Sequence, residues 1–116
     1  MAPKKSPSSI TVNVPVYIFL EDGVHVAYTP VLELSSYGSS VADAKKSFEE
    51  AVDIFFEDVS EKGTLEKVLL QLGWQLQQKP KPIYKEPQSS KALSERLRKK
   101  NPEKVYRERI KIPLSA

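Results

Sequence analysis

Alternation of apolar residues over Ile10–Leu20 is the feature that most constrains the fold. Every even position in this run is apolar. A period of two is typical of a β-strand that buries one face in a core. Because Pro15 has no backbone donor, the strand is expected to lie at a sheet edge or at a bulge there. Glu21-Asp22-Gly23 then predicts a tight turn, and residues 24–29 a second strand that completes a hairpin.

The next segment predicts a loop, a short third strand and a helix that covers the sheet. Pro30 breaks the second strand, and residues 31–38 read as a loop that enters the third. Ser39 or Ser40 is placed as a helix N-cap, because a serine followed by Asp43 offers acceptors to the first-turn amides. The apolar face of this helix follows from spacings of three and four at Ala44, Phe48, Ala51, Val52, Phe55, Phe56 and Val59.

The rest of the chain predicts smaller elements. Gly63 ends the first helix, and Thr64 is expected to cap a second one that Gly73 ends. Ser90 is expected to cap a basic helix over 91–100 with a narrow Leu93 and Leu97 stripe. A last strand alternates Tyr106, Ile110, Ile112 and Leu114 with cations, and Glu108 interrupts its apolar side.

These patterns predict an α+β fold: a small antiparallel sheet of three to four strands packed against one or two helices, with a basic C-terminal extension. The expected organisation is a disordered segment over 1–8, an α+β domain over 9–76, a Pro/Gln/Lys-rich linker over 77–89, and a basic helix and strand over 90–116.

Composition narrows the class of protein. The 116 residues contain no cysteine, which excludes disulfides and thiolate chemistry and favours a cytoplasmic setting. The N-terminal segment lacks the apolar core of a signal peptide. The longest dense apolar run of the chain, from Val14 to Leu20, is far shorter than the roughly 20 residues that span a bilayer, so we expect no membrane association.

Charge is distributed unevenly along the chain. Residues 9–78 contain four lysines and eleven acids, a net charge of −7, whereas residues 79–116 contain twelve bases and four acids, a net charge of +8. An acidic part followed by a basic tail predicts two different electrostatic partners, or one surface that folds onto the other.

Residues for catalysis or metal binding are sparse. His25 is the only histidine and is expected to be a half-exposed strand residue, because one imidazole alone makes a poor metal site. Asp22, Glu33 and Asp43 would suit a divalent cation if they met, which leaves a vestigial metal-dependent nuclease as a third hypothesis. Turn, capping and solvated-surface roles explain these acids more simply. We therefore expect no catalytic residue, no metal and no cofactor.

The order of turns and caps resembles the N-terminal domain of the HicB-like antitoxins. The match covers about residues 10–72. Its elements are Tyr17, Glu21-Asp22-Gly23, Tyr28-Thr29-Pro30, Tyr37-Gly38, Ser40 and Asp43-Ala44.

The resemblance implies a partial ribonuclease H fold without catalytic carboxylates, in a bacterial, non-enzymatic protein of a toxin–antitoxin system. Such proteins bind small basic HicA-like RNA-cleaving toxins and cover their active surface, and the chain would form a dimer or tetramer. The tail would wrap the toxin or complete the sheet. The expected contact residues are Glu21, Asp22, Tyr28, Leu32 and Glu33.

The alternative hypothesis is a transcriptional regulator that binds nucleic acid, such as operator DNA, through the basic tail. Many HicB-like proteins carry a ribbon-helix-helix or helix-turn-helix module, but here the last strand follows the helix, which reverses ribbon-helix-helix order. The candidate residues are Arg96, Arg98, Lys99, Lys100, Arg107, Arg109 and Lys111.

Overall fold

The chain forms a four-stranded antiparallel sheet, a separate two-stranded sheet and three helices, which confirms the predicted α+β class. The computed structural model describes residues 9–77, 83–87 and 91–113. The predicted disordered segment, the Ser90 cap and Leu114 lie outside the described residues. The elements are β1 (Ser9–Glu21), β2 (Val24–Thr29), β3 (Leu34–Gly38), α1 (Val41–Glu61), α2 (Leu65–Gln71), β4 (Gln75–Gln77), β5 (Ile83–Lys85), α3 (Lys91–Lys99) and β6 (Lys104–Pro113).

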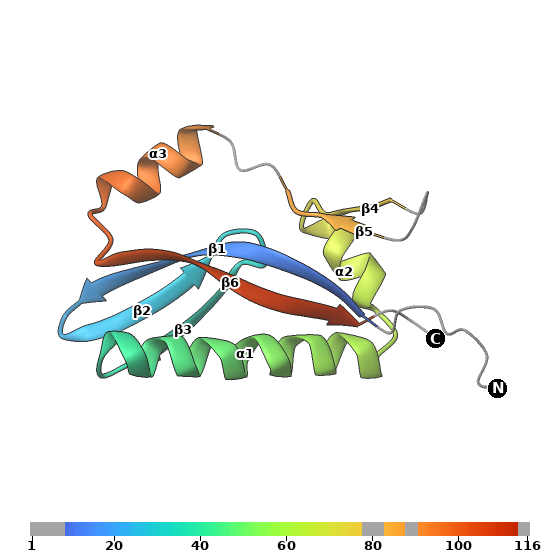
Figure 1. The fold of residues 1–116 in the computed structure, drawn as a ribbon, viewed down its shortest axis with the longest axis horizontal. Helices are drawn as coiled ribbons and strands as arrows, with labels where there is room; N and C mark the ends of the chain where they lie inside the picture. Colours follow the sequence, from blue (N-terminus) through green and yellow to red (C-terminus); the bar gives the residue numbers. More distant parts are fainter. Residues whose placement is uncertain (1–8, 78–82, 88–90, 114–116) are drawn as a thin grey trace.

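The main sheet has the strand order β3-β2-β1-β6 (Figure 1). β1 forms the predicted hairpin with β2 through a turn at Asp22 and Gly23, both at positive φ. β6 pairs with β1 from Ser9 to Ile18, so the last strand completes the sheet. At Pro15, β1 has only β6 beside it, because pairing with β2 starts at Tyr17. The proline therefore lies at a local edge, as predicted.

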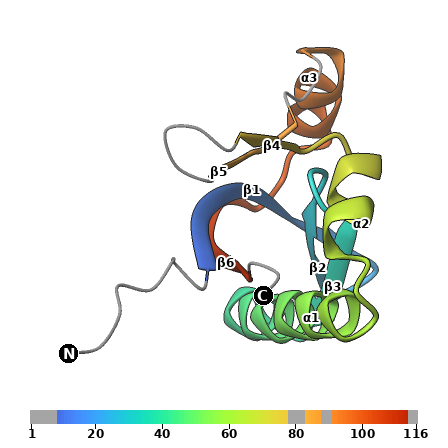
Figure 2. The ribbon, with the colours of Figure 1, turned by 90° about the vertical axis from the view of Figure 1, so that its right-hand side faces the viewer.

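α1 covers the sheet face formed by the even positions of β1. Val14, Val16 and Ile18 are fully buried there. They pair with Glu108, Tyr106 and Lys104 of β6, so the even positions of β6 share this face. Figures 1 and 2 show α1 running beneath this face. The predicted apolar stripe of the helix is confirmed, with Ala44, Phe48, Val52, Phe56 and Val59 buried.

The start of α1 is fixed by the predicted serine cap. The Asp43 amide donates to Ser40 Oγ at 3.0 Å, while Asp43 Oδ2 accepts from the Ser39 amide at 2.9 Å. The hydrogen bonds from the Ser39 amide and hydroxyl lower the pKa of Asp43 below its usual value. Thr64 precedes α2 but makes no side-chain cap bond; its hydroxyl lies 3.5 Å from the Val59 carbonyl oxygen.

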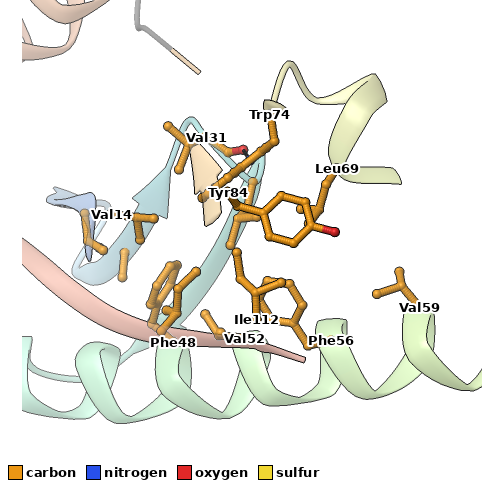
Figure 3. Packing of buried hydrophobic residues seen from close by; sticks show 14 of the residues in the cluster. Val14, Val31, Phe48, Val52, Phe56, Val59, Leu69, Trp74, Tyr84 and Ile112 are labelled. Carbon is orange, nitrogen blue, oxygen red and sulfur yellow. Dashed lines mark hydrogen bonds between the residues drawn. The ribbon is translucent and has the colours of Figure 1, made fainter. Parts of the chain in front are cut away.

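α2 and the β4–β5 hairpin close one end of the core. Figure 3 shows Trp74 and Tyr84 packed beside Leu69 and Val31. Trp74 is 1% exposed, and its indole Nε1 donates to the Val31 carbonyl at 2.8 Å. The predicted extended linker over 77–89 is therefore wrong at Ile83–Lys85. A single aromatic residue, Tyr84, anchors that segment despite its polar composition.

α3 packs on the opposite face of the sheet from α1 (Figures 1 and 2). Leu97, with Leu93 beside it, contacts Tyr17 and Phe19, which are odd residues of β1. Two leucines thus attach a strongly basic helix to the fold. No helix among the described residues is long and apolar enough to cross a membrane.

Candidate binding surfaces

The five predicted partner-contact residues do not form one patch. Asp22 lies in the turn before β2, whereas Glu33 lies in the turn after it, with positive φ. The six residues of β2 between them correspond to about 20 Å of extended chain. Leu32 is 3% exposed and packs in the core, so its prediction as a contact residue is wrong. The residue lies in a loop by sequence, but its apolar side chain packs with the core cluster.

Two of the five residues, Glu21 and Tyr28, do share a groove beneath α3. This α3 groove has a volume of about 350 Å³. Burial, followed by the charge of Glu33, raises the pKa of Tyr28. Acidic and basic groups meet here, because the lining residues are Phe19, Glu21, Val26, Tyr28, Ser35, Leu93, Arg96, Leu97 and Lys100.

The structure also gathers the predicted nucleic-acid-binding cations on the α3 side of the sheet. Arg107, Arg109 and Lys111 pair with Pro15, Asn13 and Thr11, the odd residues of β1. These positions share the face on which α3 packs. A hollow of about 380 Å³ includes both Arg98 and Arg107 in its lining. Arg107 Nη1 also donates to the Asn13 carbonyl at 3.2 Å. We call this cationic side, with Arg96, Lys99 and Lys100 exposed on or just after α3, the basic face.

A further groove lies between α1 and β6, with a volume of about 660 Å³. Val52, Phe56 and Ile110 give it an apolar floor. Four carboxylates surround that floor: Glu49, Asp53 and Glu57, each four residues apart on α1, and Glu108 on β6. Arg109 and Lys111 of β6 also line the groove, so its acids outnumber its cations by four to two. We call this surface the α1–β6 groove.

Sequence reasoning did not predict the α1–β6 groove as a site. Two signals for it were present in the sequence. Acids recur at an interval of four beside the apolar stripe of α1, which places them in one row along the helix. Glu108 interrupts the apolar side of the last strand. The pairing of β6 with β1 brings these signals together.

Two ionisable groups in or beside the α1–β6 groove, Glu108 and Tyr106, have raised pKa values. Burial, followed by the charge of Glu49, raises the pKa of Glu108, and Asp53 adds to the shift while Lys45 opposes it. Burial and the nearby charges of Glu108 and Glu49 raise the pKa of Tyr106 to about 12. These shifts indicate a negative potential at a partly desolvated place.

Lys45 on α1 lies over the aromatic ring of Tyr106. Its Nζ lies 4.5 Å from the centre of the Tyr106 ring, within the range of a cation–π interaction. The Tyr106 hydroxyl is buried and has no hydrogen-bond partner among the described residues. Buried polar atoms normally have one.

His25 is partly buried, as predicted, and has a partner that the sequence did not indicate. Its Nδ1 lies 2.6 Å from Glu103 Oε2, and this contact ties β2 to the residue before β6. The backbone amide of Glu103 also donates to the Ile18 carbonyl at 2.7 Å. The position therefore has a structural role.

No metal centre is assembled within the described part of the chain. No three histidine, aspartate or glutamate side chains of these residues are grouped so that they could hold a metal ion. Asp22 and Glu33 lie in turns at opposite ends of β2. Asp43 accepts two hydrogen bonds from Ser39. The structure thus does not bring together the three acids that would suit a divalent cation.

Comparison with known proteins adds no identification. A scan against protein-family models finds no match, and searches of curated proteins and of solved structures find none either. The functional reading therefore depends on the surfaces themselves.

Proposed function

We propose that this chain is a cytoplasmic bacterial binding protein of the antitoxin type, without enzymatic activity. It neutralises a small basic HicA-like RNA-cleaving protein by covering that protein's active surface. The observation that carries the proposal is the α1–β6 groove, an apolar floor lined by four carboxylates and two cations, with a net negative charge. An RNA-cleaving protein needs cations at its active surface to hold phosphate, and those cations would complement this groove.

The acidic surface extends beyond the groove. Glu50 and Asp58 are exposed on α1 and do not line the groove. They add negative charge to the same helix, so a basic partner would meet a continuous field before contact. Complementary fields of this kind accelerate encounter and discriminate against wrong partners.

The test is inhibition of a small basic ribonuclease encoded beside this chain. The purified full-length chain should abolish RNA cleavage at equimolar ratio, and the association rate should fall steeply as salt is raised. Cleavage that continues at a tenfold excess of this chain would refute the proposal. Added single-stranded RNA serves as a control, because a chain that merely sequesters RNA would lose its effect when RNA is in excess.

A second candidate function is nucleic-acid binding, and the basic face is the observation in its favour. Cations from α3 and β6, which are separate in sequence, lie on one side of the sheet. Charge reversal at Arg96 and Lys100 should then abolish retardation of operator DNA at low salt. Reversal at Lys62 and Lys67, which lie outside the basic face, is the matched control. No retardation of DNA by the wild-type chain would rule this function out.

A further inference from the structure

We infer that the free edge of β6 binds an extended segment of the partner protein as a fifth strand. The segment would present alternating apolar and cationic side chains to the α1–β6 groove and acidic or neutral side chains to the opposite face. This inference rests on the proposed function and specifies which surface of the chain the partner occupies and what sequence pattern the partner must have.

The first support is the position of β6 in the sheet. It is the terminal strand, and β1 is its only strand partner within the described residues. In an antiparallel pair, alternate residues direct their backbone N–H and C=O groups away from the neighbour. The ten residues of β6 therefore offer outward donors and acceptors to an added strand, the usual basis of strand-addition recognition.

The second support is the chemistry next to that edge. The α1–β6 groove lies between the edge strand and the carboxylate row of α1, so a strand added to β6 would pass along it. Phe56 and Ile110 would receive an apolar side chain. Glu49, Asp53 and Glu108 would receive a lysine or arginine two positions away, because residues i and i+2 of a strand share a face.

The third support explains why the occupant is another protein and not a second copy of this chain. In antiparallel self-pairing that continues the sheet, residues facing the same side are opposite one another. Arg107, Arg109 and Lys111 all face the same side of β6. The two registers that pair the greatest length of β6 and preserve this side would place Arg107 opposite Arg109 or opposite Lys111, and such cation pairs are destabilising. A heterologous strand with acids in those positions has no such conflict.

The experiment uses the full-length chain and two synthetic peptides of identical composition. In the first, lysine and leucine alternate along one face of the extended peptide, with glutamate and threonine on the other. In the second, lysine and glutamate occur on both faces. Fluorescence anisotropy should detect binding of the first peptide, and the second should bind about tenfold more weakly.

Matched charge reversals locate the site. Glu49→Lys with Asp53→Lys should weaken binding of the first peptide about tenfold, whereas Glu66→Lys with Glu95→Lys, exposed on α2 and α3 outside the groove, should leave binding within about twofold of the wild type. Amide hydrogen exchange should show new protection at alternate residues of β6 and none in β3, the other edge strand. Protection of β3, equal binding of both peptides, or equal binding by the two charge-reversed chains would overturn the inference.

The two experiments distinguish failure of the proposed function from failure of this inference. If the peptide protects β6 but the chain does not inhibit the basic ribonuclease, the strand site stands and the antitoxin function is wrong. If the chain inhibits the ribonuclease and Glu49→Lys with Asp53→Lys inhibits equally well, the function stands and the strand site is wrong.

Discussion

Tyr106 combines properties that rarely occur in one residue of a stable core. Its hydroxyl is buried without a hydrogen-bond partner in the described chain, and its ring lies under the Lys45 ammonium. The ring therefore contributes packing and a cation–π contact, while the hydroxyl contributes only a desolvation cost. Such an atom is informative, because native structures leave few of them.

Tyr106→Phe should therefore stabilise the protein. We expect the free energy of unfolding at pH 7 to rise by about 1 kcal/mol, measured by urea denaturation. At high pH the tyrosine should destabilise further, because its folded pKa of about 12 exceeds the ordinary value of 10.0. The unfolded state loses its proton first, so stability falls between pH 10 and 12.

The control for that experiment is Tyr37→Phe, because Tyr37 is 63% exposed. It should change stability by less than about 0.5 kcal/mol. A decrease in stability for Tyr106→Phe would show that the hydroxyl has a partner that this account lacks.

Glu108 gives a second prediction, with the same direction of pH dependence but at acidic to neutral pH. Its pKa is raised above 4.5, mainly by burial, so the folded state holds the proton more tightly than the unfolded state does. Stability therefore falls as pH rises above 4.5 through the folded pKa. Glu108→Gln should stabilise the protein at pH 7, and the gain should shrink as pH approaches 4.5.

The measurement is chemical denaturation of wild type and Glu108→Gln at both pH values. Glu50→Gln serves as the control, because it removes a carboxylate of α1 that lies outside the α1–β6 groove. A gain that is equal at the two pH values would contradict the role of burial and attribute the effect to packing of the amide.

At the scale of elements, β3 and α1 approach each other closely at Gly38. A Cβ on Gly38 would lie only 2.7 Å from the Ala44 Cα and closer still to its amide nitrogen. Real Cβ atoms do not approach backbone so closely. The glycine in the resemblance pattern thus has a physical reason here, because it lets the strand touch the first turn of the helix.

Gly38→Ala should separate β3 from α1. We expect a loss of about 2–3 kcal/mol in the free energy of unfolding, accompanied by faster amide exchange in β3. Ser35→Ala, on the same strand but exposed, should change stability by no more than about 0.5 kcal/mol. Equal effects of the two substitutions would show that the strand tolerates displacement from the helix.

Elements with strong local signals could be predicted from the sequence. The alternation before Glu21, the Ser40 cap and the stripe through Phe48 each depend on neighbours within a few residues, and all three are confirmed. β5 could not be predicted, because its pairing with β4 and the burial of Tyr84 in the core depend on residues outside the segment. Long-range packing overrides a local composition that is typical of a linker.

Site prediction was weaker for the same reason. Leu32 was expected at the surface, and its burial depends on contacts formed by the turn after β2. The α1–β6 groove requires a strand and a helix that are far apart in sequence to meet. Neither fact is encoded in a local pattern, whereas the charge of each part of the chain was readable directly.

At the scale of the whole molecule, acids predominate on one side of the sheet and cations on the other. α1 carries the acids below it and the basic face lies above, although the last strand is part of the same sheet. The N-terminal domain and basic tail predicted from sequence therefore share one core. Ile110 and Ile112 are buried in it with Val14 and Phe48.

Deletion of residues 91–116 should therefore abolish folding and not merely remove a tail. β1 would lose its partner strand, and the core would lose two isoleucines, a loss of at least about 4 kcal/mol. Circular dichroism and urea denaturation should show no cooperative transition. Leu93→Ser with Leu97→Ser is the control, because it detaches α3 alone and should leave a cooperative transition. Cooperative unfolding of the truncated chain would show that residues 9–87 fold independently.

The pairing of the first strand with the last also governs when the protein forms during its synthesis. β1 leaves the ribosome well before its partner from Lys104 to Pro113, because most of the domain separates the two strands in sequence. Long-range pairing of this kind is slow, because the entropy of closing the loop is lost before the contacts form. The nascent chain must therefore carry an apolar strand with an open edge until β6 has been synthesised. A chain that lacks β6 would expose that edge and be a substrate for aggregation or proteolysis, so the acidic groove forms only once β6 is present.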